Sequence, residues 1–181
     1  MLGILAMSGT AQARISKKKL IEKGVALAEE WTVQPPKPGE VCFTPGSRCD
    51  LKLLKFVESA QKSLDIAIFD VNLDELVHAI LVQSKKIPVR VLVDQRQAKG
   101  RYSLVSTLVK GGVSVRTGRQ RGIMHHKFTL VDGARVETGS FNYTNHAANA
   151  NQENQIYLDD PAVVSRYRVR FDEIWEKGKP Y

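Results

Sequence analysis

Two short stretches of the sequence carry residue types suited to phosphate chemistry: MHHKFTLVD beginning at residue 124 and GSFN beginning at residue 139. If the first stretch is a β-strand, His125 and Lys127 point to the same face, because side chains alternate along a strand. Ser140 and Asn142 have the same spacing and would also share a face in an extended segment. An imidazole, an ammonium, a hydroxyl and an amide together predict a cradle for a tetrahedral phosphate oxyanion, with the imidazole available as nucleophile or base.

The spacing of these residues forms a longer pattern, His-x-Lys-x4-Asp, then six intervening residues, then Gly-Ser. It is occupied by His125, Lys127, Asp132 and Gly139-Ser140, so all five fixed positions match. The sequence thereby resembles the phospholipase D superfamily, and within it the small bacterial endonucleases of the Nuc type, which carry one copy of the motif. The resemblance extends over about residues 41–175.

The resemblance implies a mechanism for the candidate residues. A neutral His125 would attack phosphorus and form a phosphohistidine, which divides one difficult displacement into two easier ones. Glu153 would accept a hydrogen bond from the other ring nitrogen, and Lys127, Ser140 and Asn142 would hold the non-bridging oxygens as negative charge builds. The implied enzyme is a phosphodiesterase, and neither a metal nor another cofactor is expected.

Several candidates also have a plain structural interpretation. Asp132 lies at a predicted hairpin, where aspartate is common for turn geometry, and the family gives it a structural or electrostatic contact. Glu153 could be a solvated carboxylate at the start of a strand, although its place after the Gly-Ser block favours a role in the site. His126 faces away from His125 and is interpreted as a packing residue. Asp70 and Asp94 end apolar strands and are interpreted as caps or turn residues.

Only one His-x-Lys pair is present. His78 falls in a predicted helix, and His146 has no paired lysine. In the family two motifs build one active site, and a second imidazole must protonate the leaving oxygen and later activate water. The resemblance therefore implies an isologous homodimer in which two copies of His125 meet on the two-fold axis.

The pattern of the chain around these residues is that of an α/β domain. Strands are predicted at 40–44, 63–69, 88–93, 113–117, 125–131, 135–138 and 154–158, and helices at 50–61, 73–85, 102–110 and 161–177. Asp132-Gly133 joins two of the strands as a hairpin. Strands that alternate with helices, with one hairpin added, predict a mixed β-sheet flanked by helices on both faces.

Charge favours a polyanionic partner, because 27 Lys and Arg against 19 Asp and Glu give a formal net charge of +8. Residues 96–121 contain no acidic residue, and this basic run leads directly to His125. It predicts contacts to a nucleic-acid backbone from Arg96, Lys99, Arg101, Arg116, Arg119 and Arg121, although a solvated basic surface is the plain alternative. Tyr102 and Tyr143 are candidates for base stacking, though each could equally lie in the core or at the rim.

The expected function is therefore metal-independent hydrolysis of DNA or RNA with little sequence specificity. One alternative is a phospholipase D that acts on phosphatidyl lipids, since the superfamily cleaves both classes of diester. That activity would call for an amphipathic segment such as 15–31, whose far end is acidic at Glu29-Glu30. A second alternative is a nucleic-acid-binding module without catalysis, which the presence of both His125 and Lys127 argues against.

The N-terminal region predicts export. Residues 1–13 are apolar and close in Ala11-Gln12-Ala13, as in the remnant of a signal peptide, and would span about 20 Å as a helix, too short for stable membrane insertion. Residues 14–38 are predicted as a helix and a proline-rich linker, and residues 39–181 as the phospholipase D-like nuclease domain. In a periplasmic or secreted protein Cys42 and Cys49 would form a disulfide. In a cytosolic protein with a frayed N-terminus they would be thiols.

Overall fold

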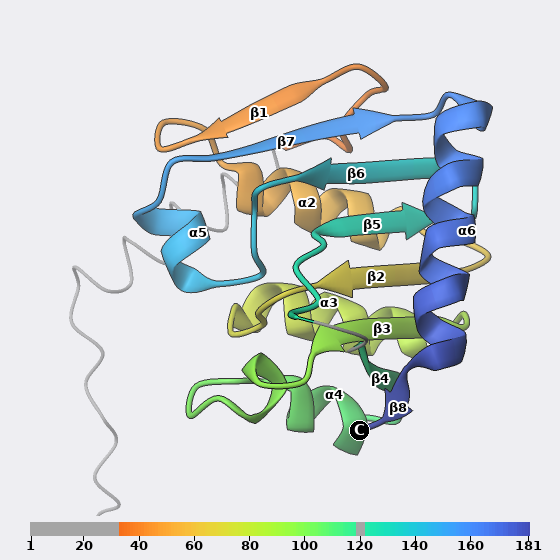
Figure 1. The fold of residues 1–181 in the computed structure, drawn as a ribbon. Coiled ribbons are helices and arrows are strands. Elements are labelled where there is room, and N and C mark those ends of the chain that lie inside the picture. The colour runs from red at the N-terminus through yellow and green to blue at the C-terminus, as the bar shows by residue number, and fades with distance from the viewer. Residues whose placement is uncertain (1–32, 119–121) are drawn as a thin grey trace, which may run out of the picture. The chain divides into compact units, whose positions relative to one another are not determined.

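The computed structural model describes residues 33–118 and 122–181, which form a single eight-stranded mixed sheet with helices on both faces (Figure 1). The strand order is β1-β7-β6-β5-β2-β3-β4-β8. The predicted signal segment and the N-terminal helix lie outside the described residues. The strands are β1 (Val41–Thr44), β2 (Leu64–Ile68), β3 (Val89–Asp94), β4 (Ser114–Gly118), β5 (Phe128–Val131), β6 (Arg135–Gly139), β7 (Glu153–Leu158) and β8 (Lys179–Pro180).

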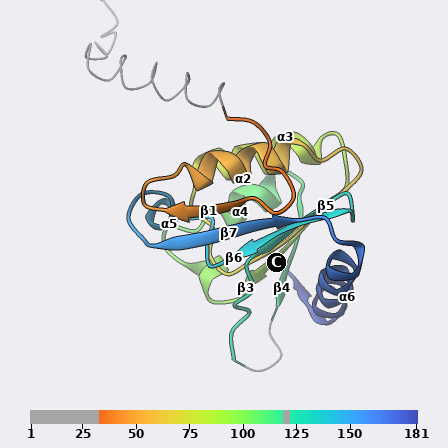
Figure 2. The same ribbon diagram turned by 90° about the horizontal axis from the view of Figure 1, so that it is seen from above.

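The helices cover the sheet unequally. Figure 2 shows α2, α3 and α4 on one face and α6 on the other. The larger apolar core lies on the face of α2, α3 and α4, and the smaller one lies beneath α6. The helices are α2 (Cys49–Glu58), α3 (Asp74–Ser84), α4 (Val105–Lys110), α5 (Asn145–Asn149) and α6 (Pro161–Lys177), with a short 3-10 helix η1 (Gln97–Lys99). The predicted mixed α/β architecture is confirmed.

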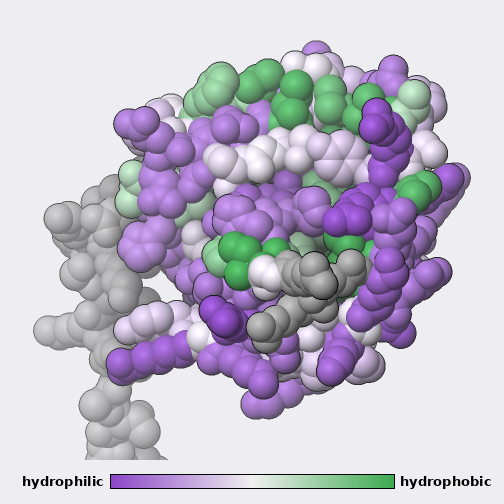
Figure 3. Space-filling view, in the orientation of Figure 1, coloured by the Kyte–Doolittle hydropathy of each residue, from purple (hydrophilic) through white to green (hydrophobic). Residues whose placement is uncertain are grey.

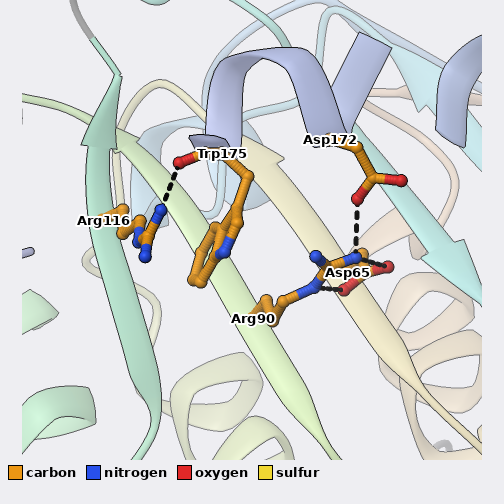
Figure 4. A network of polar contacts seen from close by, with 5 residues as sticks. All are labelled: Asp65, Arg90, Arg116, Asp172 and Trp175. Carbon is orange, nitrogen blue, oxygen red and sulfur yellow. Dashed lines mark hydrogen bonds and ion pairs between the residues drawn. The ribbon is translucent and has the colours of Figure 1, made fainter. Parts of the chain in front are cut away.

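An arginine network holds α6 on the sheet (Figure 4). Arg90 on β3 pairs with Asp65 on β2 at 2.7 Å and with Asp172 on α6 at 3.0 Å. Arg116 on β4 donates to the carbonyl of Trp175 at 2.7 Å, and its guanidinium lies 4.8 Å from the Trp175 ring centroid. The Arg116 guanidinium therefore contributes to the packing of α6, and its predicted contact with nucleic acid stays a prediction.

Strand directions bring the candidate residues to one edge of the sheet. Because β2 and β3 are parallel and β5 runs against them, Phe128 at the start of β5 pairs with Ala67 near the end of β2. Gly139 at the end of β6 pairs with Gln155 near the start of β7. The segments that precede β5 and β7 and those that follow β1, β2, β3 and β6 therefore meet at this edge, to the left in Figure 1, which we call the site edge.

Two predicted elements begin later than expected. The strand predicted from His125 begins at Phe128, because side chains bind the backbone of the preceding residues. Asp94 accepts from the N–H of Met124 at 3.0 Å, and Thr138 donates to the carbonyl of Lys127 at 3.2 Å. The helix predicted from Tyr102 begins at Val105, so Tyr102 lies in the loop before it.

A disulfide joins Cys42 of β1 to Cys49 at the start of α2. It secures an edge strand whose other face is open, since Val41 and Phe43 are 45% and 61% exposed. Figure 3 shows hydrophobic residues along the top of the view, where Figure 1 draws β1, and a smaller hydrophobic group near the centre of a face that is otherwise mostly hydrophilic. Among the described residues, no helix is both apolar and long enough to cross a bilayer.

Candidate active site

His125 and Lys127 form the centre of the site. The His125 ring is exposed at the site edge and packs edge-on against Phe69 with 4.7 Å between ring centroids. Lys127 is buried beneath it, with Nζ 3.2 Å from His125 Nε2 and 3.1 Å from the His125 carbonyl. The alternation predicted for a strand therefore persists in the extended segment before β5, and it places an accessible imidazole above a fixed ammonium.

This contact defines the roles of the two ring nitrogens. An ammonium has only hydrogens to donate, so His125 Nε2 must accept, and the proton of a neutral ring then lies on Nδ1. Burial lowers the pKa of Lys127, and the negative charge of Glu153 opposes that shift. The result is an imidazole whose lone pair at Nε2 lies beside a cation, so a phosphate that approached Nε2 would also meet the ammonium.

The Gly-Ser turn joins β6 to β7. A Cβ at Gly139 would collide with the backbone oxygen of Asn154, so close strand contact requires glycine there. Ser140 Oγ donates to the Glu153 carboxylate and accepts from the Asn154 N–H at 3.1 Å. Asn151 donates to the other Glu153 oxygen at 2.9 Å. No hydrogen bond joins Glu153 to His125 in the described structure, so Glu153 is held by the turn residues instead.

Asn142 differs from Ser140 in having unused hydrogen-bonding capacity. Its Oδ1 is buried and has no partner among the described residues. A buried polar atom without a partner costs about 1–3 kcal/mol, so each such atom calls for an explanation, such as a bound water or a contact to substrate. Backbone bonds fix its position, because Tyr143 donates to the carbonyl of Asp70 at 3.2 Å and accepts from Asn72 and Leu73. Asn142 is therefore the candidate whose side chain the fold itself leaves without a partner.

Asp132 lies away from the other candidates. It follows β5, whereas His125 precedes it, and seven extended residues span on the order of 20 Å. Its Oδ1 accepts from the backbone N–H groups of Gln61, Lys62 and Ser63 at 2.7 to 3.1 Å. Burial by itself would raise the pKa of Asp132, but these donors and Arg135 outweigh it and lower the pKa. Asp132 therefore anchors the hairpin to the start of β2, which agrees with the structural contact that the resemblance implies, and a catalytic role for it stays a prediction.

His126 faces the other side of the sheet, as predicted for a packing residue. Its ring contacts Phe128 edge-on at 5.7 Å between centroids, and Phe128 in turn contacts Tyr167 of α6. Burial lowers the pKa of His126, and the positive charge of Arg170 on α6 lowers it further. Arg170 is thus a further basic residue whose charge acts on the segment that carries His125. The basic run did not predict this arginine, because it is separated from that run in sequence.

The basic run divides into three groups. Arg96, Lys99 and Arg101 are exposed in the loop that follows β3 at the site edge. Arg116 belongs to the α6 network described above. Arg119 and Arg121 lie outside the described residues. Of the two candidate stacking residues, Tyr143 is 1% exposed and belongs to the core, whereas Tyr102 is 72% exposed.

Two residues were missed as site-building groups. Phe69, just after β2, supports the His125 ring, and its own ring centroid lies 5.3 Å from Lys127 Nζ. Asp94 is interpreted from the sequence as a cap, and one of its oxygens does accept from the backbone N–H of Arg96 at 2.9 Å. Its second oxygen accepts from the N–H of Met124, which the sequence did not predict. The available signal was their position at the carboxyl ends of parallel strands, where α/β proteins gather their sites.

A buried polar cluster lies in the sheet behind the site. Glu137 on β6 is 2% exposed and accepts from Thr129 at 3.0 Å, and Tyr143 contacts the same hydroxyl. Burial raises the pKa of the Glu137 carboxyl to about 8, although the Thr129 hydrogen bond opposes the shift. The cluster connects β5, which follows Lys127, to the segment that carries Asn142. Within residues 33–118 and 122–181, no group of three or more His, Cys, Asp or Glu is placed to hold a metal ion.

Comparisons with known proteins converge on one family. The family model described as "Cardiolipin synthase, PLD-like domain" matches residues 53–175. The chain is 36% identical over 147 residues to the mitochondrial cardiolipin hydrolase of Xenopus tropicalis, covering 79% of this chain and 70% of that protein. It is 33% identical over 141 residues to the mitochondrial cardiolipin hydrolase of Chlamydomonas reinhardtii, covering 77% of this chain but only 62% of the algal protein.

Solved structures share the fold. Nuc from Salmonella typhimurium, described as a phospholipase D family member, superposes with a TM-score of 0.74 at 26% identity, covering 78% of this chain and 96% of that chain. NucT from Helicobacter pylori superposes with a TM-score of 0.73 at 23% identity, covering 79% of this chain and 98% of NucT. The similarity therefore covers nearly the whole of both structures and most of the chain described here.

Proposed function

Because the chain belongs to the phospholipase D superfamily and is a phosphodiesterase of that family, we propose that it is an endonuclease that hydrolyses DNA or RNA through a phosphohistidine at His125. The superfamily predicted from the His-x-Lys motif is confirmed by the family match and by the fold. The observation that carries the proposal is the exposed imidazole of His125, with Nε2 3.2 Å from a buried ammonium. That pair can attack phosphorus and hold a non-bridging oxygen at the same time.

The charge of the site edge supports a nucleic-acid substrate. No acidic residue occurs from residue 95 to residue 131, and the loop after β3 presents Arg96, Lys99 and Arg101 to solvent. Such a surface attracts a polyanionic backbone independently of base sequence. Contacts of this kind carry no base information, so the proposal includes weak sequence specificity.

A second copy of the chain would complete the site. Leaving-group protonation and water activation require another acid–base group, and the chain has one His-x-Lys pair. We propose an isologous homodimer in which His125 of one protomer attacks while His125 of its partner protonates the leaving oxygen. The exposure of His125 at the edge of the fold allows a partner to approach it.

A lipid diester is the second candidate substrate. The curated relatives named above are cardiolipin hydrolases, and Ile123, two residues before His125, is 52% exposed. An exposed apolar side chain beside the site would suit an enzyme that works at a lipid surface. The one-sided positive charge favours nucleic acid, although anionic lipid would also be attracted to it.

The deciding experiment compares substrates in excess EDTA. Wild type and His125→Ala are incubated with single-stranded DNA, duplex DNA, RNA and cardiolipin vesicles. The proposal expects wild type alone to cleave nucleic acid. Release of phosphatidic acid from cardiolipin without nucleic-acid cleavage would establish the lipase instead. Nucleic-acid binding without any turnover would favour the non-catalytic module.

We also propose that the protein works in the periplasm or outside the cell. The disulfide between Cys42 and Cys49 supports an oxidising compartment. The apolar segment 1–13 supports the same proposal from the sequence. Fractionation of cells that express the full chain tests it, and retention in the cytosol would contradict it.

A further inference from the structure

We infer that the loop from residue 95 to residue 104 is a base-stacking site, with Tyr102 as the platform for an unpaired base of the nucleic-acid substrate. The inference rests on the proposed nuclease function and goes beyond it by assigning a contact to the base rather than to the phosphate. The structure supplies three supports for it: the exposure of Tyr102, the charge around it and the attachment of the loop to the catalytic segment.

Tyr102 is the most exposed large apolar side chain of the described residues, at 72%. Its position follows from the late start of α4 at Val105, which leaves Tyr102 in the loop rather than on a helix. The guanidinium of Arg101 lies 5.5 Å from its ring centroid, so one side of the ring is already next to a cation. An exposed aromatic ring beside an arginine combines a stacking surface with a phosphate contact.

The loop is held in place at both ends. At its start, Asp94 accepts from the N–H groups of Arg96 and Gln97 at 2.9 and 3.2 Å. At its end, Leu104 donates to the carbonyl of Val71 at 2.9 Å, beside the segment that follows β2. Between them Ala98 is 2% exposed, and its carbonyl accepts from the Tyr181 hydroxyl at 3.0 Å. A loop fixed in this way loses little conformational freedom when it binds, so an exposed ring on it is preorganised for contact.

The same carboxylate connects the loop to the nucleophile. Asp94, itself 2% exposed, uses its second oxygen to bind the N–H of Met124 at 3.0 Å, one residue before His125. Asp94 therefore ties the start of the loop to the backbone beside His125, and in the proposed complex a nucleic-acid strand with a phosphate at His125 extends along this loop. Arg96 and Lys99 are exposed there to hold the adjacent phosphates, and Tyr102 is available to a neighbouring base.

Geometry favours an unpaired base over a lipid chain as the occupant of Tyr102. A base-paired nucleotide has both faces covered by its neighbours, whereas an unpaired base can leave the stack and lie on an aromatic ring. The loop around Tyr102 is cationic, and Ala98 and Leu104 on either side are buried or partly buried, so no continuous apolar surface is offered to acyl chains.

The test measures affinity in the inactive His125→Ala background, so that binding is separated from cleavage. Fluorescence anisotropy is recorded for a single-stranded DNA oligonucleotide and for the same oligonucleotide with abasic sugars in place of its central nucleosides. Tyr102→Ala is expected to weaken binding of the normal oligonucleotide about 5- to 10-fold, and Tyr102→Phe to restore it. With the abasic oligonucleotide the Tyr102→Ala effect should disappear. Val82→Ala, an exposed change on α3, is the surface control and should leave both affinities unchanged.

Three results would overturn the inference. Equal affinity of Tyr102→Ala and its parent for the normal oligonucleotide would show that no base stacks there. A loss that persists with the abasic oligonucleotide, or that phenylalanine does not rescue, would assign Tyr102 to loop structure or phosphate contact. A loss confined to binding of cardiolipin vesicles would make it a membrane contact. Failure of the catalytically intact enzyme to cleave any nucleic acid, with Tyr102-dependent base binding retained, would remove the proposed function and leave the stacking site standing.

Discussion

In the proposed reaction, His125 and Lys127 would divide the work between an exposed side chain and a buried one. The imidazole would have to reach substrate, and the ammonium would have to be fixed before negative charge develops. The exposed ring of His125 and the buried Nζ of Lys127, 3.2 Å from its Nε2, suit these two roles. Phe69 supports the pair from the neighbouring strand, and Asn142 brings an amide oxygen that the fold leaves without a partner. The remaining motif residue, Asp132, has a different task, and its variants can separate stability from catalysis.

Asp132→Ala is expected to lower the free energy of unfolding by about 1–3 kcal/mol without changing the turnover number of the folded enzyme. It removes an acceptor shared by three backbone N–H groups, at a residue whose φ of 59° is unfavourable for alanine. Asp132→Asn should lower the free energy of unfolding by less, since asparagine tolerates that conformation and retains one acceptor oxygen. Urea denaturation and kcat are measured on both variants. A hundredfold drop in the kcat of the folded Asp132→Asn variant would instead assign Asp132 a catalytic role.

The buried Glu137 carboxyl should make the stability of the fold depend on pH. Its pKa is about 8 when folded and about 4.3 in an unfolded chain, so between these values the unfolded state releases a proton that the folded state keeps. Rising pH therefore weakens the fold across that interval, and the effect levels off above about pH 8. Glu137→Gln should flatten this slope in urea denaturation from pH 5 to 9, whereas Glu75→Gln, an exposed change in the first turn of α3, should keep it. If stability falls equally steeply with pH in wild type and Glu137→Gln, the raised pKa of Glu137 is contradicted.

At the scale of elements, the site depends on segments that approach one another from distant parts of the sequence. β1 is secured to α2 by Cys42 and Cys49. Its last residue, Thr44, donates to the carbonyl of Asn151 at 2.9 Å and accepts from the N–H of Glu153 at 3.1 Å. The disulfide therefore supports the strand that positions Glu153, although neither cysteine lies in the site.

Replacing both cysteines by serine is expected to cost about 2–3 kcal/mol of stability, from the loop-closure entropy that the bond removes from the unfolded chain. Dithiothreitol should lower the Tm of wild type and leave that of the double variant unchanged. Wild type isolated from the periplasm without reductant should contain no free thiol. Two titratable thiols in that sample would contradict the bond.

The element pattern was largely predictable because local signals agree with the final packing. Alternating apolar strands, the Asp132-Gly133 hairpin and the helix 161–177 appear in the structure close to their predicted positions. What could not be predicted are contacts between residues far apart in sequence. The position of Arg116 under α6, the bond from Asp94 to Met124 and the support of His125 by Phe69 each depend on which elements become neighbours. Charge alone also could not distinguish a packing arginine from one that faces substrate.

At the scale of the whole molecule, the single His-x-Lys pair makes the proposed enzyme depend on its partner. Co-expression of wild type with equal amounts of His125→Ala is expected to leave about one quarter of the wild-type activity per dimer, because only homodimers of wild type hold two histidines at the axis. Independent sites would leave about one half. Tagged subunits and sequential affinity purification allow the mixed dimer to be assayed alone. An active mixed dimer with half the wild-type turnover would contradict the composite site.

The most direct test of the central claim is the stereochemical course at phosphorus. A dinucleotide phosphorothioate of one configuration is cleaved in ¹⁸O-labelled water, and the configuration of the chiral product is determined. Attack by His125 followed by hydrolysis of the phosphohistidine comprises two in-line displacements, each of which inverts phosphorus, so the account predicts overall retention. Overall inversion would mean that water attacks the substrate directly, and His125 would then be a general base rather than the nucleophile.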